Sequence, residues 1–353
     1  MITELLNTTD PRWNEVLARI PHDFYHLPKY VELEAARVGG IAGAIYIEEE
    51  DSQFLQPVVL RNLPSSMPGV SAEATDASSP YGYPGPLIDA RDGFTETLKT
   101  ALPRFMRERH ILSLFVRLNP LLNDPVLLAG LGSVVQHGEV IWIDLTLAQE
   151  ELHRQTRSSY RYDTKKMKVE GVATQFDEDF ALYEDFINLY YSTMTDVAAH
   201  EMYYFDRHYF ERLREALGEN MKLVVVKYGD IIAAAGLFVR TGGIIQYHLS
   251  GTNKGSGQPN ATKAMIIFVR DWAKSVGAES FHLGGGLGSM ADNLGYFKRG
   301  FSKLTQPFHT WRLVGDSDAY EICMKEWSRR AGCDADEMTG FFPAYRKPIA
   351  LGN

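Results

Sequence analysis

The sequence has little cysteine and no long hydrophobic run. Its two cysteines, Cys323 and Cys333, have a spacing that fits neither a CxxC redox pair nor a zinc knuckle, so we expect buried or free thiols and no metal site. No apolar stretch approaches the roughly 18 residues of a membrane-spanning helix. The first residues lack the cationic and apolar regions of a signal peptide. These absences predict a cytoplasmic protein without integral membrane contact.

Positive charge is also scarce. The formal net charge is −9, with 36 lysine and arginine residues against 45 aspartate and glutamate residues. This balance excludes a protein that coats nucleic acid with a generally basic surface, although it allows a local basic patch. The 353 residues fit two domains of common size, and a content of 45% hydrophobic residues predicts that the chain folds throughout.

What the sequence does contain is a repeated order of predicted elements: helix, helix, hairpin, irregular loop, helix, strand. In the first half we expect helices over 11–20, 29–38 and 94–109, and strands over 44–47, 54–60, 112–117 and 140–143. In the second half we expect helices over 180–196, 207–217 and 261–276, the last one N-capped by Asn260, and strands over 222–226, 231–240, 244–249 and around Phe281.

This repeat predicts the fold class, an α/β chain with mixed sheets (α+β) in two similar tandem domains. The first domain is expected over 1–148, completed by 312–353, and the second over 149–311. In the second, one helix joins the strand ending at Leu249 to the strand ending at Leu283, so the two strands should be parallel. Their C-terminal ends, Ser250-Gly251 and Gly284-Gly285-Gly286, would then share the sheet edge where α/β sheets bind ligands.

A local basic patch is predicted between the halves. Arg154, Arg157, Arg161, Lys165 and Lys168 step by three or four residues, so on a single helix they form one basic face. In an acidic protein such a face is suited to phosphates. The same spacing is also typical of a solvated surface helix.

Side chains that could act in chemistry lie on both sides of the strand-end glycines. Phe297-Lys298-Arg299 sets an aromatic ring beside two cations, which suits a base, a phosphate or a developing oxyanion, although a solvated turn has the same pattern. His248 and His282 lie next to the two strand ends, and Asp292 lies between them and the lysine. Each is a candidate proton acceptor, while a strand histidine is more often a hydrogen-bonded structural residue.

Together these segments resemble the FemABX-like aminoacyltransferases, a branch of the GNAT (GCN5-related acyltransferase) superfamily. The likeness rests on the basic segment and on the stretches Tyr247-His248-Leu249-Ser250-Gly251, Leu283-Gly284-Gly285-Gly286 and Tyr296-Phe297-Lys298-Arg299-Gly300-Phe301. The rigid loop Ser79-Pro80-Tyr81-Gly82-Tyr83-Pro84-Gly85-Pro86 and the segment Phe341–Arg346 add to it. The resemblance implies two tandem GNAT-like domains.

The resemblance further implies transfer of an amino acid from aminoacyl-tRNA to a free amine of a peptide or peptidoglycan-precursor-like acceptor, with no further cofactor. Lys298 is then expected to act in catalysis with Asp292 and His248, and the acceptor would contact Tyr247, Tyr81 and Tyr83. Donor-binding residues would be Phe297, Arg299, Ser250, Gly251, Gly284, Gly285, Gly286, Arg157, Arg161 and Lys165. The chain departs from the family at Thr193–Asp196, where members often have an arginine.

Two alternatives remain open. The first is an acyl-CoA-dependent N-acyltransferase acting on a small amine. GNAT enzymes that bind CoA usually hold its pyrophosphate on a glycine-rich loop before the central helix. Here only Gly255-x-Gly257 of that pattern remains, and Pro259 removes one N–H donor. The second alternative is a non-catalytic binding protein that kept the fold and lost the reaction.

Overall fold

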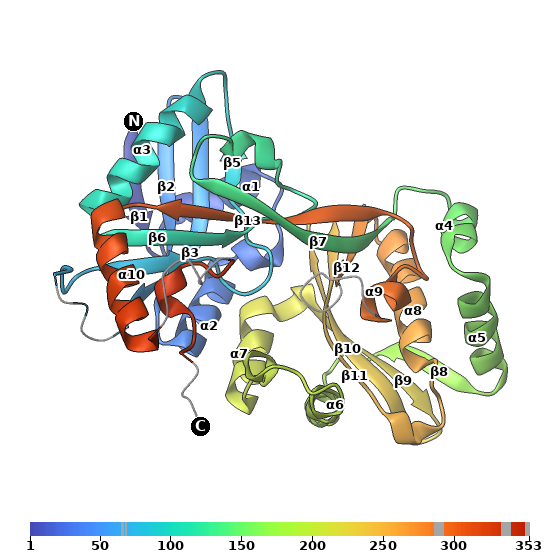
Figure 1. Ribbon diagram of the computed structural model, residues 1–353. Helices are drawn as coiled ribbons and strands as arrows, with labels where there is room; N and C mark the ends of the chain where they lie inside the picture. Colours follow the sequence, from blue (N-terminus) through green and yellow to red (C-terminus); the bar gives the residue numbers. More distant parts are fainter. Residues whose placement is uncertain (65–66, 68, 286–292, 333–339, 350–353) are drawn as a thin grey trace. The chain divides into compact units, whose positions relative to one another are not determined.

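The computed structural model describes residues 1–64, 67, 69–285, 293–332 and 340–349 (Figure 1). The chain forms two compact units: unit 1 comprises Met1–Gln136 and Phe308–Asn353, and unit 2 comprises His137–Pro307. Both boundaries between the units fall within strands, β7 (Ser133–Asp144) and β13 (Thr305–Val314). The sequence predicted these boundaries at 148/149 and 311/312.

Unit 1 is built on one sheet with the strand order β1-β2-β3-β4-β6-β13, in which β5 also pairs with β3. Besides β13, its strands are β1 (Ile2–Leu6), β2 (Ile41–Glu49), β3 (Ser52–Asn62), β4 (Thr75–Ser78), β5 (Leu87–Asp89) and β6 (Ile111–Arg117). Its helices are α1 (Pro11–Arg19), α2 (Pro28–Val38), α3 (Phe94–Glu108) and α10 (Ser317–Ala331), with short 3-10 turns η1 (Phe24–His26), η2 (Pro125–Leu128) and η8 (Ala344–Arg346).

Successive side chains along the β2–β3 hairpin point to opposite faces of the sheet, and both faces carry apolar side chains. Ile45 and Ile47 pack in one core with α3, whereas Ala44 and Tyr46 pack in another with α1 and α2. The helix ends follow local rules. The Asp10 side chain accepts a hydrogen bond from Arg12 N at the start of α1, and Gly39 closes α2 in the left-handed conformation with φ 64°.

A buried carboxylate fastens the C-terminal segment to unit 1. Asp76 on β4 is fully buried and forms ion pairs with Arg61, at 2.8 Å, and with Arg346 of η8. Tyr345 donates a hydrogen bond to the same carboxylate at 3.4 Å, and its hydroxyl also lies 2.9 Å from Ser113 Oγ on β6. The segment after α10 is therefore held to the sheet by charge-assisted hydrogen bonds.

Unit 2 repeats this arrangement with the strand order β8-β9-β10-β11-β12-β7. Besides β7, its strands are β8 (Val172–Phe176), β9 (Met221–Tyr228), β10 (Ile231–Thr241), β11 (Ile244–Thr252) and β12 (Ser280–Gly285). Its helices are α4 (Gln149–Gln155), α5 (Ser158–Val169), α6 (Tyr183–Asp196), α7 (Arg207–Leu217), α8 (Ala261–Ser275) and α9 (Asn293–Lys298), with 3-10 turns η3 (Glu201–Tyr203), η4 (Gly218–Asn220) and η5 (Lys254–Ser256).

Two glycines show that α6 and α8 cover opposite faces of the unit 2 sheet. A Cβ atom on Gly251 of β11 would lie 2.6 Å from the backbone of Leu189 in α6, and a Cβ atom on Gly236 of β10 would lie 3.1 Å from Met265 in α8. Gly251 pairs with Ala235, the neighbour of Gly236, so the two glycines belong to opposite faces. The main core of unit 2 lies between the sheet, α8 and α5.

The predicted repeat of elements is confirmed in the strand pairing. In unit 1, β3 and β4 are antiparallel and β4 and β6 are parallel; in unit 2, β10 and β11 are antiparallel and β11 and β12 are parallel. The last strand of each sheet comes from elsewhere in the chain. β7 follows β6 yet pairs with β12, while β13 follows α9 and pairs with β6. Unit 1 thus needs both ends of the chain to complete its sheet, whereas unit 2 completes its sheet with the first strand of one continuous segment.

One local prediction was wrong, and another held for position but not for the expected bond. The basic segment is not one helix, because α4 ends at Gln155, α5 begins at Ser158, and Thr156 and Arg157 form the break. Asn260 is the N-cap residue of α8, as predicted, but its side chain forms no capping bond, since its Oδ1 accepts a hydrogen bond from the Lys263 ammonium at 2.7 Å instead. Among the described residues, no helix combines the length and apolar character needed to cross a membrane.

We predict that Asp76→Ala will lower the stability of the protein by about 3 kcal/mol, because it leaves two arginines and a tyrosine without their shared buried acceptor. Denaturant unfolding of the variant measures this loss. The control is Asp51→Ala, which removes an ion pair with Arg91 whose side chains are 71% and 70% exposed. Equal unfolding midpoints for the two variants would contradict the structural role of Asp76.

Candidate active site

β11 and β12 run parallel but pair only near their N-terminal ends. The described pairs are Ile244 with Ser280, Ile245 with Phe281, and Gln246 with His282. Within two residues of the last pair, each strand has a bulge against its neighbour on the other side. The extra residue is His248 in the pairing of β11 with β10, and Leu283 in the pairing of β12 with β7. Such bulges bend a strand and raise its twist. The two C-terminal strand ends, 247–252 and 283–285, therefore continue beyond the shared ladder.

Lys298 lies at one of these strand ends. It is the last residue of α9, is only 7% exposed, and donates a hydrogen bond from Nζ to the carbonyl oxygen of Gly285 at 2.7 Å. Gly284 has φ 77°, and a Cβ atom built on it would lie 3.2 Å from Lys298 Nζ. This glycine thus serves the left-handed turn and the close approach of the lysine. Gly286 and Asp292 lie outside the described residues.

A neutral histidine lies beside the lysine. His282 is buried, and its Nδ1 lies 2.8 Å from Gln246 Oε1 on the paired strand. Burial, and then the positive charge of Lys298, lower the pKa of His282 to about 3. The ring is uncharged at neutral pH, and its contact with Gln246 joins β11 to β12 at the last ladder pair.

Tyr247, His248 and Ser250 follow on β11. The Tyr247 ring stacks on Phe238 at 5.3 Å between centroids, and its hydroxyl lies 2.5 Å from Ser250 Oγ. Burial raises the pKa of Tyr247 to about 12 and lowers the pKa of His248 to about 3. Both side chains are therefore uncharged at neutral pH. His248 would be a weak general base at that pH, because catalytic efficiency requires a pKa near the working pH.

The end of β11 is fixed onto α6. Gly251 allows the backbones to approach, as described above, and Thr252 N donates to Thr193 Oγ1 at 2.9 Å. Thr193 also donates to the carbonyl oxygen of Leu189 at 2.8 Å. At the position where the resemblance led us to look for an arginine, this chain thus has a hydroxyl that anchors the strand.

The aromatic residues near Lys298 have different surroundings from those expected. Phe297 packs against Tyr160 and Phe301, with centroids 5.8 and 5.3 Å away, so its ring belongs to the edge of the core. Tyr296, which the sequence reasoning missed, is 64% exposed, and the Arg157 guanidinium lies 4.3 Å from its ring centroid. The sequence offered a signal for it only in its place next to Phe297.

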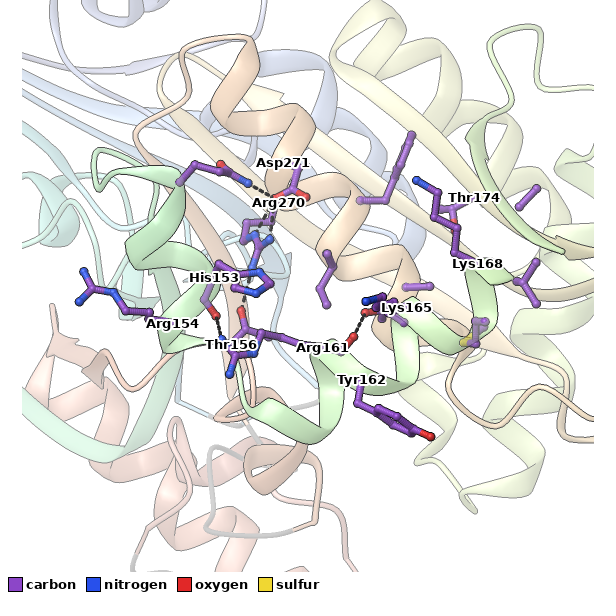
Figure 2. A pocket seen from close by; sticks show the side chains of 18 of the residues that line it. His153, Arg154, Thr156, Arg161, Tyr162, Lys165, Lys168, Thr174, Arg270 and Asp271 are labelled. Carbon is purple, nitrogen blue, oxygen red and sulfur yellow. Dashed lines mark hydrogen bonds and ion pairs between the residues drawn. The ribbon is translucent and has the colours of Figure 1, made fainter. Parts of the chain in front are cut away.

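The remaining donor-site predictions fall in two places. Arg299 lies near the lysine, with its guanidinium 3.9 Å from Glu139 of β7. Arg161 and Lys165 line a groove of about 1320 Å³ between α4, α5 and α8, together with Arg154 and Lys168 (Figure 2). Arg157 is absent from that groove and lies over Tyr296 instead, because the break between α4 and α5 turns it away from the basic stripe.

The tyrosines expected to bind the acceptor are in unit 1, in a loop held by many hydrogen bonds. Tyr30 donates to the carbonyl oxygen of Tyr81 at 3.1 Å, and Tyr81 N donates to the buried Glu34 carboxylate at 3.4 Å. The Tyr83 ring packs edge-on against Tyr25 and Phe308, with centroids 5.9 and 5.4 Å away. The loop is therefore rigid, and the role of its two tyrosines stays a prediction.

The loop before α8 has already used most of its backbone donors. Five N–H groups donate within the loop and the first turn of the helix, those of Gly255, Ser256, Gln258, Ala261 and Lys263. Pro259 has no N–H to offer. Free N–H groups at a helix start are what bind a pyrophosphate, so this loop is poorly suited to CoA. Among the described residues, no cluster of three or more acidic, histidine or cysteine side chains is arranged to hold a metal ion.

Comparison with known proteins agrees with this geometry. Residues 154–299 match the family model for an acetyltransferase (GNAT) domain. In solved structures, the fold is similar to that of FemX, with a TM-score of 0.67 at 12% identity over 90% of this chain and 99% of FemX. Residues 154–299 are thus similar to a GNAT domain, and the chain has a fold similar to that of FemX.

The chain is also similar in fold to two lysylphosphatidylglycerol synthetase structures. The C-terminal domain of the putative enzyme from Agrobacterium fabrum has a TM-score of 0.55 at 14% identity, over 90% of this chain and 95% of that one. L-PGS from Bacillus licheniformis has a TM-score of 0.53 at 13% identity, over 90% and 96%. A search of curated proteins finds no significant sequence match.

We predict that His282 makes stability depend on pH. Its pKa of about 3 in the folded protein lies below the ordinary 6.5, so as pH falls the unfolded chain binds a proton before the folded one does. The stability that this ring contributes is complete above about pH 6.5 and is lost progressively toward pH 3. In His282→Gln, the slope of unfolding free energy against pH in this window should fall by about 1.4 kcal/mol per pH unit.

Unfolding curves at several pH values measure this slope. His208→Gln is the control, because the side chain of His208 is 72% exposed on α7. The control should keep the slope of the unchanged protein. A His282→Gln variant with that same slope would show that the histidine is not held neutral by its surroundings.

Proposed function

We propose that the protein is an acyltransferase that moves an amino acid from aminoacyl-tRNA to a free amine of a peptide or of a peptidoglycan-precursor-like acceptor. The observation that carries this proposal is the buried Lys298 at the diverging ends of β11 and β12, in a GNAT domain whose helix-start loop has few donors left for CoA. The donor site would use Lys298, Arg299, Tyr296 and the strand ends 250–251 and 284–285. Phe297 would support these residues from the core.

The reaction forms an amide bond and breaks an ester bond. The amine nitrogen attacks the ester carbonyl carbon, the tetrahedral intermediate carries an oxyanion, and the ribose oxygen leaves when it collapses. The amine loses one proton and the ribose oxygen gains one proton, so the reaction balances without another reactant. The fixed positive charge of Lys298 would stabilise the oxyanion or the departing ribose oxygen in a site of low exposure, where such a charge acts most strongly.

The related folds support the choice of an aminoacyl donor. The two lysylphosphatidylglycerol synthetases are named for a product in which lysine is joined to phosphatidylglycerol. Transfer of an aminoacyl group is thus the chemistry named for other proteins of this fold. Under this proposal the protein needs no cofactor besides its co-substrate, aminoacyl-tRNA, and works in the cytoplasm, where that donor is made.

A CoA-dependent acyltransferase is the second candidate, favoured by the match to an acetyltransferase family model. Gly257, with φ 71°, preserves part of the glycine pattern of a pyrophosphate loop. The two candidates differ in donor, so they can be separated directly. The purified protein is incubated with charged tRNA and a panel of amine acceptors, and with acetyl-CoA in parallel. We expect transfer from charged tRNA; transfer from acetyl-CoA alone would refute the proposal.

We predict that Lys298→Ala will lower the rate of transfer on the order of 10²- to 10³-fold, the usual effect of removing a group that stabilises an oxyanion. The measurement is single-turnover formation of the amide from charged tRNA, with circular dichroism to check folding. Lys303→Ala is the matched control, because this exposed lysine lies five residues further on and its described contact is to a backbone carbonyl oxygen. Unchanged turnover in Lys298→Ala would remove the lysine from the mechanism.

A further inference from the structure

The groove between α4, α5 and α8 has a basic wall over an apolar floor. The cationic side chains of this wall come from α4 and α5 and are those of Arg154, Arg161, Lys165 and Lys168 (Figure 2). The floor includes Ala264, Ile267 and Phe268 of α8. Two acidic residues also line it, Glu150 and Asp271, and Asp271 is bonded to Arg270 and Gln149. Positive charge therefore prevails on the groove in a protein whose net charge is −9.

Two contacts hold α8 to the helices of the basic wall. Arg270 of α8, 3% exposed, donates to Thr156 Oγ1 at 2.7 Å and to the carbonyl oxygen of Leu152 at 3.3 Å, so it fixes the break between α4 and α5. The partly buried Lys263 ammonium lies 2.6 Å from the Asp163 carboxylate and joins α8 to α5. The groove is thus preformed and its basic wall is fixed to α8.

The basic wall presents charges that the described residues leave available. Arg161, Lys165 and Lys168 span about 10 Å along one side of α5. Lys165 and Lys168 are exposed and have no ion pair within the described part of the chain. Lys166 on the same helix differs, because it is outside the groove and its ammonium lies 3.6 Å from Glu170.

The same helix connects the groove with the lysine site. At its start, Arg157 N donates to the carbonyl oxygen of Gly300 at 2.7 Å, and the Arg157 guanidinium covers the exposed Tyr296. One turn later, the Tyr160 hydroxyl donates to the carbonyl oxygen of Phe297 at 3.1 Å. α5 therefore runs from the segment that contains Lys298 to the basic wall.

We propose that this groove binds the sugar-phosphate backbone of an RNA whose 3′ end lies at Lys298; this rests on the proposed function. Cations repeated along a concave surface suit successive phosphates, and apolar and aromatic side chains beside them suit sugars and bases. Tyr162, 68% exposed at the groove, supplies such a ring. A concave site beside a transfer site fits a nucleic acid strand better than a flat membrane surface.

The test uses charge reversal of the two unpaired lysines, Lys165→Glu/Lys168→Glu. The probe is a fluorescein-labelled hairpin RNA with a tRNA acceptor-stem sequence and a CCA end, and the readout is its anisotropy at several salt concentrations. We expect affinity to fall on the order of tenfold or more, and the slope of log affinity against log salt to become smaller by about 2, one for each lost phosphate contact. Lys165→Arg/Lys168→Arg should keep affinity and slope.

The matched control, Lys166→Glu/Lys325→Glu, reverses the same number of charges at exposed sites outside the groove, the second on α10 of unit 1. It should bind the hairpin as the unchanged protein does. Equal losses in the control and the groove variant would overturn the proposal, because they would report net charge alone. Binding of phosphatidylglycerol vesicles that is lost in the groove variant, with RNA binding unchanged, would also overturn it in favour of a membrane contact.

The groove and the proposed function can fail separately. If the unchanged protein transfers only from acetyl-CoA, yet binds the hairpin through Lys165 and Lys168, the function is refuted and the groove assignment stands. If it transfers from charged tRNA and the groove variant keeps the same KM for that donor, the function stands and the groove assignment is refuted.

Discussion

The hydrogen bond from Lys298 Nζ to the carbonyl oxygen of Gly285 is the contact on which the arrangement of the site depends. It places a cation of 7% exposure at the end of β12, and burial of a charge is costly unless a partner is supplied. Gly284 must then have no side chain, and His282 must remain neutral beside the cation. The buried amino group of Lys298 thus joins the end of β12 to α9 and constrains the residues at two neighbouring positions, Gly284 and His282.

The scaffold around this contact is rigid because each unit completes its sheet with a distant strand. β7 pairs with β12 directly beside the glycines, and the residues that pair there, Val140 and Ile141, are buried. On the other side, Gly251 and Thr193 hold the end of β11 against α6. A site built on packed strands and helices keeps its geometry more closely than one built on loops, and a reaction that depends on a fixed charge requires such geometry.

Much of this fold was predictable from local sequence patterns. The prediction of the basic helix failed where a side chain forms a hydrogen bond with a residue far away in the sequence. The meander, the crossover helix and the parallel strands follow from hydrophobic period, turn residues and handedness. The continuous basic helix was wrong because Arg270, more than a hundred residues later, binds the break at Thr156. Asn260 seemed a capping residue by type, yet Lys263 occupies its side-chain oxygen.

The sequence by itself determined the repeated order of elements and the shared edge of the two glycine-containing strand ends. Those features depend on residue type and short spacing, which can be read from the chain directly. The choice of Lys298 as the first residue to test came from the family resemblance of its segment. Only the tertiary structure decided that Arg157 lies over Tyr296, that Phe297 packs into the core edge, and that Arg161 and Lys165 face a separate groove. These outcomes depend on which surfaces pack together. Residues spaced by three or four along the sequence face different neighbours when a two-residue break separates their helices.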